Sequence, residues 1–223
     1  MSFVHPSGDH RRIPQPKILL EGTHLTRKTD LAFALAEHPE IVGERKHRWH
    51  IPLISAEWET RSKVAPPTKS SPGVSMIDFE LGDIEWVNAC YRNYLDLLDL
   101  HRSYYWIIDR FHVSTLAHQM LTYGRQLDLT WVDNRLAELG FVLVHCWRHP
   151  ATFERAREDR LVYSENPDRY RDLGLFVEEQ RVMQEIVSQS SLPTLTVDVS
   201  ADNVDECATA VIRTMQEMGM FWT

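Results

Sequence analysis

Eight consecutive residues combine a glycine, a lysine and three threonines at a spacing that suits phosphate chemistry. They read Gly22-Thr23-His24-Leu25-Thr26-Arg27-Lys28-Thr29. A phosphate-binding loop has a glycine, four further residues and then Gly-Lys-Ser/Thr, between a strand and a helix. Its backbone N–H groups and the helix dipole hold phosphate oxygens, its lysine reaches the terminal phosphates, and its hydroxyl ligates magnesium. The octet is predicted to form such a loop; the alternative is a turn in which Lys28 and Thr29 only open a helix.

Arg27 stands where the loop pattern has its second glycine. If this position needs a positive φ, a side chain there costs on the order of 1 kcal/mol or more. Alternatively, Arg27 supplies an extra cation to an anionic ligand and compensates for a poorer nest of backbone N–H groups. Both interpretations stay open at the level of sequence.

The chain that carries this octet has 223 residues, of which 43% are hydrophobic and 25% are charged. Such values are typical of a globular protein. For a chain of this length we expect a single domain, over 17–223, preceded by a flexible tail over 1–16. Lys and Arg total 24 against 32 Asp and Glu, so the net charge of −8 argues against nucleic-acid polymers as ligands. No apolar run approaches the roughly 18–20 residues of a membrane span. The three cysteines lack CxxC pairing, so we expect a soluble, cytoplasmic protein without a disulfide framework.

Short apolar runs alternate with helical patterns from residue 17 onward. Strands are predicted at residues 18–20, 50–56, 104–108, 141–146 and 195–198. Helices are predicted over residues 28–38, 84–98, 113–122, 128–139, 150–160, 168–190 and 203–218, with Gly140 suited to end one of them. The Pro- and Ser-rich residues 62–75 indicate a long exposed loop.

Strand runs without polar alternation indicate burial on both faces, as in a parallel sheet. The predicted fold class is therefore α/β, a doubly wound, five-stranded parallel sheet flanked by helices. Ligands bind such folds outside the carboxyl ends of the strands. The polar residues at those ends are Glu21-Gly22, Ala56-Glu57, Asp109-Arg110, residues 145–149 and residues 198–200.

Three motifs, taken in order, resemble thymidylate kinase and its relatives among the phosphate-loop nucleoside and nucleotide kinases. Those enzymes carry Leu-Glu-Gly before the loop lysine, then Asp-Arg-aromatic and Ser-x-x-Ala-Tyr-Gln, and later an arginine-containing lid. The corresponding residues here are Leu20-Glu21-Gly22 with Lys28-Thr29, Asp109-Arg110-Phe111, and Ser114-Thr115-Leu116-Ala117-His118-Gln119. His118 replaces the usual tyrosine. The resemblance spans about residues 17–218, with the lid at about 150–172.

The resemblance implies a P-loop kinase fold that uses ATP and Mg²⁺. Phosphoryl transfer needs positioning and charge neutralisation more than covalent help. Lys28 is expected to contact the donor phosphates, and Thr29 and Asp109 to hold magnesium, Asp109 through water unless it orients the acceptor. Arg110 would clamp an acceptor phosphate or the transferring group with its planar fork. The alternative for Asp109 and Arg110 is a helix cap and a surface arginine.

Further arginines and a strand end complete the expected donor site. Arg155, Arg157 and Arg160 would close over the phosphates as a lid; interleaved acidic residues also permit a solvated helix face paired at i,i+4. Ser200, after the last strand, occupies the place where the family holds the donor adenine. His24 lies inside the loop and is expected to touch phosphate. The eleven histidines show no ligand spacing on one element, so no transition-metal site is expected.

Candidate acceptor residues follow the second strand and lie along the helix at 84–98. A hydroxyl acceptor needs a carboxylate base, for which Glu57 is the first candidate; a monophosphate acceptor suits Arg110. Trp58 would stack on a base or pack under the long loop. The remaining candidates, each with core packing as an alternative, are Trp86, Tyr91, Arg92, His112 and Ser114.

The sequence therefore favours an ATP- and magnesium-dependent kinase of a nucleoside monophosphate or a nucleoside, expected as a homodimer. Two alternatives stay open because of Arg27. One is a protein that binds a nucleotide or another phosphate ligand without turnover. The other is a phosphotransferase that acts on another small metabolite.

Overall fold

The computed structural model describes residues 17–42, 53–56, 60–61, 74–102 and 104–220. The expected tail over 1–16, the candidate residues Glu57 and Trp58, and most of the expected loop at 62–75 lie outside these residues. Within them, no helix is both long enough and apolar enough to cross a bilayer.

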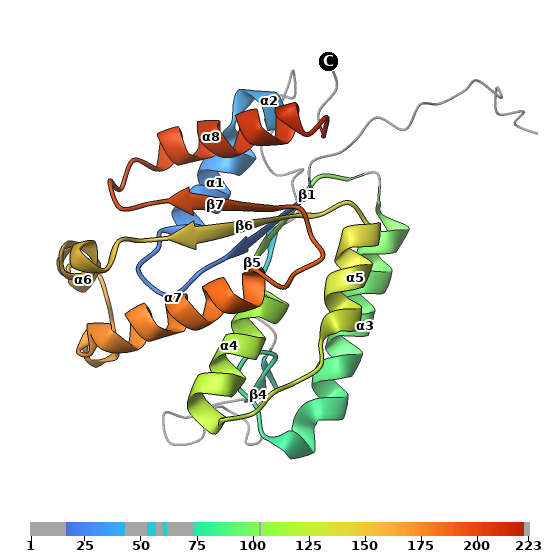
Figure 1. The fold of residues 1–223 in the computed structure, drawn as a ribbon, viewed down its shortest axis with the longest axis horizontal. Helices are drawn as coiled ribbons and strands as arrows, with labels where there is room; N and C mark the ends of the chain where they lie inside the picture. The colour runs from blue at the N-terminus through green and yellow to red at the C-terminus, as the bar shows by residue number, and fades with distance from the viewer. Residues whose placement is uncertain (1–16, 43–52, 57–59, 62–73, 103, 221–223) are drawn as a thin grey trace, which may run out of the picture.

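A parallel sheet forms the centre of the molecule (Figure 1). Its body is four strands of four to six residues: β1 (Lys17–Glu21), β5 (Trp106–Asp109), β6 (Val142–Trp147) and β7 (Thr194–Asp198). A two-residue strand, β2 (Leu53–Ile54), pairs with β5 at one edge, giving the order β2-β5-β1-β6-β7. The predicted parallel α/β class is confirmed. The predicted count of five full strands is corrected to four, because only two described residues of the run at 50–56 pair with the sheet.

Helices follow the predicted order with small shifts at their ends. They are α1 (Lys28–Glu37), α2 (Pro39–Val42), α3 (Ile84–Leu100), α4 (His112–Tyr123), α5 (Thr130–Glu138), α6 (Phe153–Leu161), α7 (Leu173–Val187) and α8 (Val204–Glu217). Short 3₁₀ turns lie at η2 (Leu81–Asp83), η3 (Pro150–Thr152) and η4 (Pro167–Tyr170), and a small antiparallel pair joins β3 (Thr60–Arg61) to β4 (Val74–Ser75). The helix predicted from residue 168 begins at Leu173 because the Asp172 side chain caps the N–H of Gly174. Gly140 ends α5 with a left-handed φ of 81°, as predicted.

Helices cover both faces of the sheet, so its strands are apolar without alternation. Ile18 and Leu20 of β1 pack in the same core cluster as residues of α1 and α8, whereas Leu19 packs in the cluster that holds residues of α3, α4, α5 and α7. Figure 1 shows α1, α2 and α8 above the sheet and α3, α4, α5 and α7 below it. All five residues of β1 are buried. This two-sided burial is the physical cause of the short continuous apolar runs in the sequence.

The parallel register brings the carboxyl ends of three strands to one edge. Leu20 of β1 pairs with Asp109 of β5, and Glu21 pairs with His145 of β6. The loops that leave these strands therefore meet at the same edge, where α6 also lies (Figure 1).

Candidate functional site

The loop between β1 and α1 turns tightly against β6. Gly22 has a φ of 152°, and a Cβ added to it would lie 2.6 Å from the carbonyl oxygen of Cys146. Leu25 and Arg27 adopt left-handed backbone conformations, with φ of 66° and 55°. The position of the second glycine thus keeps a conformation that glycine favours, although it carries an arginine. The side chain of Arg27 pairs with Asp30, at 2.7 Å from Nε to Oδ2, on the first turn of α1.

The interior of the loop is organised around Lys28. Its Nζ donates to the carbonyl oxygen of Thr23 at 2.7 Å and lies 3.4 Å from the hydroxyl of Thr26, which also donates to the Thr23 carbonyl. Lys28 is 6% exposed. The ammonium group is thus buried at the N-terminus of α1, where unpaired backbone N–H groups and the helix dipole favour an anion.

Thr29 and Asp109 meet across the ends of β1 and β5. The hydroxyl of Thr29 donates to Oδ2 of Asp109 at 2.7 Å. The other carboxylate oxygen, Oδ1, is buried and has no hydrogen-bond partner among the described residues. A buried carboxylate oxygen beside a hydroxyl is a donor set that hard cations such as Mg²⁺ prefer. No group of three or more His, Cys, Asp or Glu residues gathers as a metal cage within the described part of the chain.

A buried carboxylate ties the phosphate loop to the neighbouring loop. Glu21 is fully buried, and its Oε1 accepts hydrogen bonds from the backbone N–H of Phe111 at 2.8 Å and of Val113 at 3.2 Å. Its Oε2 accepts from the hydroxyl of Ser114 at 2.5 Å. Burial raises the pKa of Glu21 above its ordinary value, against the lowering effect of the Ser114 and Phe111 hydrogen bonds. Ser114, a predicted substrate-binding residue, is therefore a buried partner of Glu21.

Arg110 lies at the junction of the two loops. Its backbone N–H donates to Leu20 at 2.9 Å, its carbonyl accepts from Ala56 at 3.1 Å, and its φ is 66°. Non-glycine residues with such a φ persist where the surroundings over-determine them, as at ligand sites. The side chain is 4% exposed and lines two cavities.

The first cavity has a volume of about 450 Å³ and lies over the phosphate loop. Its wall joins the loop to the end of β5 and to residues 156–170, which follow β6. The residues that line it are His24, Leu25, Thr26, Arg27, Lys28, Thr29, Asp30, Asp109, Arg110, Ala156, Asp159, Arg160, Tyr163, Arg169 and Tyr170. The second cavity, of about 350 Å³, is lined by His24, Ser75, Ile77, Asp78, Arg110, His118, Arg169 and Glu179. His24, Arg110 and Arg169 belong to both, so the two cavities meet at these residues.

His24 accepts a hydrogen bond from the guanidinium of Arg169, at 2.6 Å from Nε2 to Nη2. Arginine is only a donor, so Nε2 carries no proton and the imidazole is neutral. Burial lowers the pKa of His24 below its ordinary value, and the charges of Arg110 and Arg169 lower it further. The histidine thus lies among cations without adding to their charge.

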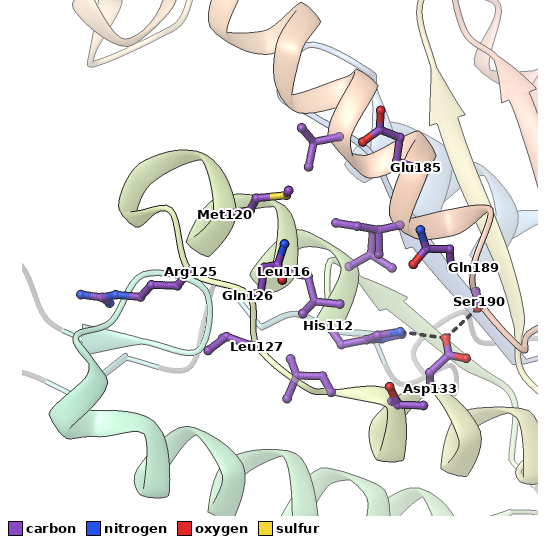
Figure 2. A pocket seen from close by; sticks show the side chains of 15 residues that line it. His112, Leu116, Met120, Arg125, Gln126, Leu127, Asp133, Glu185, Gln189 and Ser190 are labelled. Carbon is purple, nitrogen blue, oxygen red and sulfur yellow. Dashed lines mark hydrogen bonds and ion pairs between the residues drawn. The ribbon is translucent and has the colours of Figure 1, made fainter.

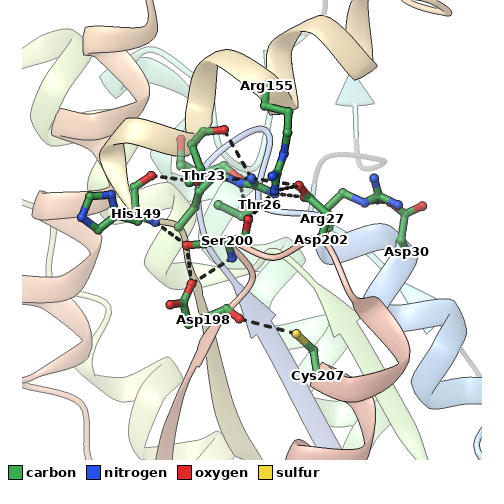
Figure 3. Close-up of polar contacts among 12 residues, drawn as sticks. Thr23, Thr26, Arg27, Asp30, His149, Arg155, Asp198, Ser200, Asp202 and Cys207 are labelled. Atoms are coloured by element: carbon green, nitrogen blue, oxygen red, sulfur yellow. Dashed lines mark hydrogen bonds and ion pairs between the residues drawn. The ribbon is translucent and has the colours of Figure 1, made fainter.

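Of the three arginines predicted for the lid, Arg160 lines the first cavity, which lies over the phosphate loop. It donates to the hydroxyl of Tyr170 at 3.2 Å. Arg155 points instead to the β7–α8 connection, where it donates to the carbonyl of Ser200 and to Asp202, both at 2.6 Å (Figure 3). Arg157 pairs with Glu154 on its own helix. For Arg157 the solvated helix face is the better interpretation, because its charge is matched within one turn.

The Ser200 region, expected to hold the donor base, forms a network of its own. The hydroxyl of Ser200 accepts from the backbone N–H of His149 at 2.8 Å and donates to Asp198 (Figure 3). Asp202 bridges Arg155 to Arg148, whose side chain is fully buried. This network fixes the β7–α8 connection beside α6.

Several predicted acceptor residues lie away from the two cavities. Tyr91 is fully buried in the core, where its hydroxyl contacts that of Thr115 at 2.6 Å, and Trp86 is half-buried against the same core. Arg92 lies over the ring of Trp131 on α5, 6.0 Å from its centroid. His112 pairs with Asp133 in a separate cavity. Tyr91 follows the helical period of Val87 and Leu95 on the inward side of α3, which faces core rather than ligand.

Four residues of this region had no role assigned from the sequence, although His145 was among the polar residues at the strand ends. Arg169 reaches His24, and Glu179 of α7 accepts from the hydroxyl of Thr23 in the loop. Gln180 holds Arg148 through two backbone hydrogen bonds of 2.8 Å. The fourth, His145, is described below. Arg169 and Glu179 belong to elements far from the loop in sequence. The signal for His145 was its polar side chain within an otherwise apolar strand.

His145 is a buried imidazole on β6 beside Glu21. It is fully buried, and neither ring nitrogen has a hydrogen-bond partner among the described residues. Burial and, to a lesser extent, the nearby charge of Lys28 together lower its pKa to about 4. The imidazole is therefore neutral at pH 7 and adds no positive charge beside Lys28.

No family model matches this sequence, and no curated protein is significantly similar to it. Its structure, however, is similar to solved structures, among which are the following two. One is the YorR protein from Bacillus subtilis, in complex with phosphorylated GDP, at 16% identity, a TM-score of 0.56, and coverage of 93% of this chain and 100% of that one. The other is the thymidylate kinase from Ehrlichia chaffeensis, at 15% identity, a TM-score of 0.52, and coverage of 91% and 99%.

Gly22→Ala should destabilise the protein, because the new Cβ would lie 2.6 Å from the Cys146 carbonyl at a strained φ. The expected loss is about 1–3 kcal/mol in the free energy of unfolding, measured by urea denaturation. Gly82→Ala is the matched control, since its Cβ would meet nothing within 4 Å. Equal stability of the two variants would contradict this account of the loop.

His145→Leu should stabilise the protein increasingly as the pH falls from 6.5 to 4. The unfolded chain takes up a proton at the ordinary histidine pKa, whereas folded His145, with a pKa of about 4, does not; wild-type stability is therefore lost through this window. The difference between variant and wild type should grow by on the order of 1 kcal/mol per pH unit in chemical denaturation. His149→Leu, at an exposed site, controls for the loss of one imidazole. A pH-independent difference would refute the assignment.

Proposed function

We propose, from the premise that the chain has a thymidylate kinase-like P-loop kinase fold, that it transfers the terminal phosphoryl group of ATP to a nucleoside monophosphate or a nucleoside. The observation that carries the proposal is the junction of two cavities at Arg110, one over the phosphate loop and one beside it. Such a junction suits a reaction in which a group passes from a donor in the first cavity to an acceptor in the second.

The donor phosphates would lie over the loop in the 450 Å³ cavity. Lys28 would exchange its hydrogen bond to the Thr23 carbonyl for phosphate oxygens, and the first-turn N–H groups of α1 would hold the remaining oxygens. Thr29 and Asp109 fit a magnesium ion through the hydroxyl and Oδ1, which has no partner within the described residues. When bound there, Mg²⁺ neutralises charge on the donor phosphates.

The transferring group would pass Arg110, whose guanidinium lines both cavities. Arg169 lines both as well, and Arg160 lines the first. These cations neutralise the charge that the equatorial oxygens carry in the transition state. Because Glu21 fixes the backbone of Phe111 and Val113, Arg110 is held in place before substrate arrives.

A monophosphate is the acceptor that this arrangement favours. Two arginines, Arg110 and Arg169, line the second cavity, and their planar forks suit phosphate oxygens. Asp78 and His118 line the same cavity, with 3.2 Å between Oδ1 of Asp78 and Nε2 of His118. Both offer polar contacts to the rest of the acceptor. A hydroxyl acceptor would need a carboxylate base, and Glu57 keeps that role as a prediction from the sequence.

The second candidate function is nucleotide binding without turnover, and Arg27 is the observation that favours it. An arginine replaces a loop glycine, and Asp30 already matches part of its charge. The left-handed backbone at Arg27 nevertheless preserves the turn into α1, so the loop geometry favours the kinase.

Purified full-length protein with ATP, Mg²⁺ and a panel of nucleosides and nucleoside monophosphates should yield a phosphorylated product detectable by mass spectrometry. Lys28→Ala should lower the turnover rate by about 10²- to 10³-fold, because a preorganised cation at the phosphates is lost. Arg171→Ala, at an exposed residue paired with Asp168, is the control and should retain full turnover. ATP binding without any product favours the second candidate, and absence of nucleotide binding refutes both.

Arg27→Gly should lower ATP affinity about 2- to 5-fold, the range expected for losing a partly exposed cation near phosphate. Arg27 lines the donor cavity, and its side chain is 33% exposed. Arg27→Ala separates charge from backbone, because it removes the cation and keeps a side chain at the left-handed position. Calorimetric titration with ATP should show weaker binding for both variants. A gain in affinity for the glycine variant would instead identify Arg27 as a tolerated defect.

A further inference from the structure

The second cavity, beside the phosphate loop, is lined by charges of both signs. Arg110 and Arg169 supply cations, whereas Asp78 and Glu179 supply carboxylates. The proposed function uses the two arginines for the acceptor phosphate and gives Glu179 no role. A carboxylate repels phosphate, so its presence in this cavity favours contact with a different part of the ligand.

Of the two carboxylates, that of Asp78 already has partners within the protein. Its Oδ1 lies 3.2 Å from Nε2 of His118 and accepts a hydrogen bond from the hydroxyl of Tyr123 at 2.7 Å. Both partners belong to α4. Asp78 thus ties the segment before α3 to α4, and Glu179 is the carboxylate whose place in the cavity needs another explanation.

Glu179 also differs from the other glutamates in the second half of α7. Glu178 and Glu185 both pair with Arg181 on their own helix. Glu185 lies beside a separate cavity between α4, α5 and α7 (Figure 2). Glu179 forms no ion pair with a lysine, arginine or histidine among the described residues. Its negative charge is therefore not matched along the helix.

The side chain of Glu179 reaches the phosphate loop instead. Its Oε2 accepts a hydrogen bond from the hydroxyl of Thr23. The carbonyl oxygen of the same Thr23 accepts from Nζ of Lys28 at 2.7 Å, so a single loop residue links Glu179 to the loop lysine. Phe176 and Gln180 are buried on either side of Glu179, which fixes this part of α7. The carboxylate is thus held between the second cavity and the loop.

The other carboxylate oxygen, Oε1, is available to a ligand. It has no hydrogen-bond partner among the described residues, and it is not one of the side-chain oxygens buried without a partner. Glu179 is half-buried and lines the second cavity. A glutamate side chain at neutral pH is a carboxylate, which accepts hydrogen bonds and donates none. The part of a ligand that meets Oε1 must therefore donate a hydrogen bond.

The position of Glu179 indicates which part of a nucleoside monophosphate this is. Thr23, its partner, is the covalent neighbour of His24, which lines both cavities together with Arg110 and Arg169. Glu179 therefore lies toward the junction, where the two arginines would hold the acceptor phosphate. In a nucleoside monophosphate the sugar is bonded to the phosphate, and the base lies beyond it. The sugar hydroxyls are thus the donors nearest to the phosphate.

We propose that Glu179 determines specificity at the acceptor site by accepting, through Oε1, a hydrogen bond from a sugar hydroxyl of the acceptor nucleotide. This role rests on the proposed function, from which the placement of the acceptor phosphate is taken. The substrate class is then a nucleoside monophosphate with at least one free sugar hydroxyl. A nucleotide phosphorylated at that hydroxyl is disfavoured, because the carboxylate repels a second phosphate.

Matched pairs of nucleotides test this role by binding. The 5′-monophosphates of adenosine, guanosine, cytidine, uridine and thymidine are each titrated calorimetrically into the full-length protein, beside the 2′,3′-dideoxy analogue that lacks the sugar hydroxyls. For the nucleotide that binds most tightly, the dideoxy analogue should bind about 10-fold more weakly, the ratio expected for one hydrogen bond to a charged group. Equal affinity within every pair, or no binding of any nucleotide, would overturn the proposal.

Glu179→Ala should weaken binding of the hydroxylated nucleotide about 10-fold and leave that of its dideoxy analogue unchanged, because only the former uses Oε1. Glu178→Ala, at the exposed neighbouring position, is the matched control and should keep the full preference. Thr23→Val removes the hydrogen bond between the loop and Glu179 but retains the carboxylate, so it should keep the preference as well. An equal loss for both nucleotides in Glu179→Ala would identify a structural role and overturn the proposal.

Glu179→Gln decides if the alanine variant does not fold. It keeps the length of the side chain but replaces a charged acceptor with a neutral one, which forms a hydrogen bond of roughly half the strength. The preference for the hydroxylated nucleotide should therefore fall from about 10-fold to about 3-fold. An undiminished preference in this variant would also overturn the proposal.

Binding also separates this role from phosphoryl transfer. A preference for the hydroxylated nucleotide without any product from ATP would refute the proposed transfer and support the role of Glu179. Product formation with equal binding of both nucleotides would support the transfer and overturn the role of Glu179.

Discussion

A single buried carboxylate, that of Glu21, holds together the two loops on which the candidate site depends. It accepts from two backbone N–H groups at the start of α4 and from the hydroxyl of Ser114. Because Glu21 ends β1 and its partners follow β5, the contact joins the phosphate loop to the loop that carries Asp109 and Arg110. Without it, three buried donors would lose their acceptor in the interior, where such losses are costly.

Left-handed backbone conformations recur in the two loops that Glu21 connects. Leu25, Arg27 and Arg110 all have a positive φ, although none is a glycine. Each such residue costs on the order of 1–2 kcal/mol and persists only if its neighbours over-determine it. At Arg110 the backbone is fixed on both sides, by Leu20 and by Ala56; at Arg27 the carbonyl accepts from Leu31 in the first turn of α1. The strain is concentrated around the cavities, as expected where the backbone is preorganised for a ligand.

The distribution of charge reconciles an acidic chain with a site for anions. The protein carries a net charge of −8, yet Lys28, Arg110, Arg160 and Arg169 line one cavity over the phosphate loop. Clustered positive charges repel one another, and here two neutral imidazoles lie beside them: His24 accepts from Arg169, and burial lowers the pKa of His145 to about 4. Keeping both histidines uncharged limits that repulsion in the absence of a phosphate ligand.

The sequence by itself determined the α/β class, the order of the elements and the three motifs that come together at one edge of the sheet. These features are local: apolar runs reflect two-sided burial, and motif spacing reflects the strand, loop and helix that carry it. Tertiary structure decided which side chains reach the cavities. Arg155 turns to Ser200, Ser114 serves Glu21, Tyr91 fills the core, and Arg169 and Glu179 arrive from elements more than a hundred residues away in the sequence. The physical reason is that helical and strand periodicity fixes which residues share a face, whereas the partner of a polar side chain depends on how distant elements pack, and no local pattern encodes that packing.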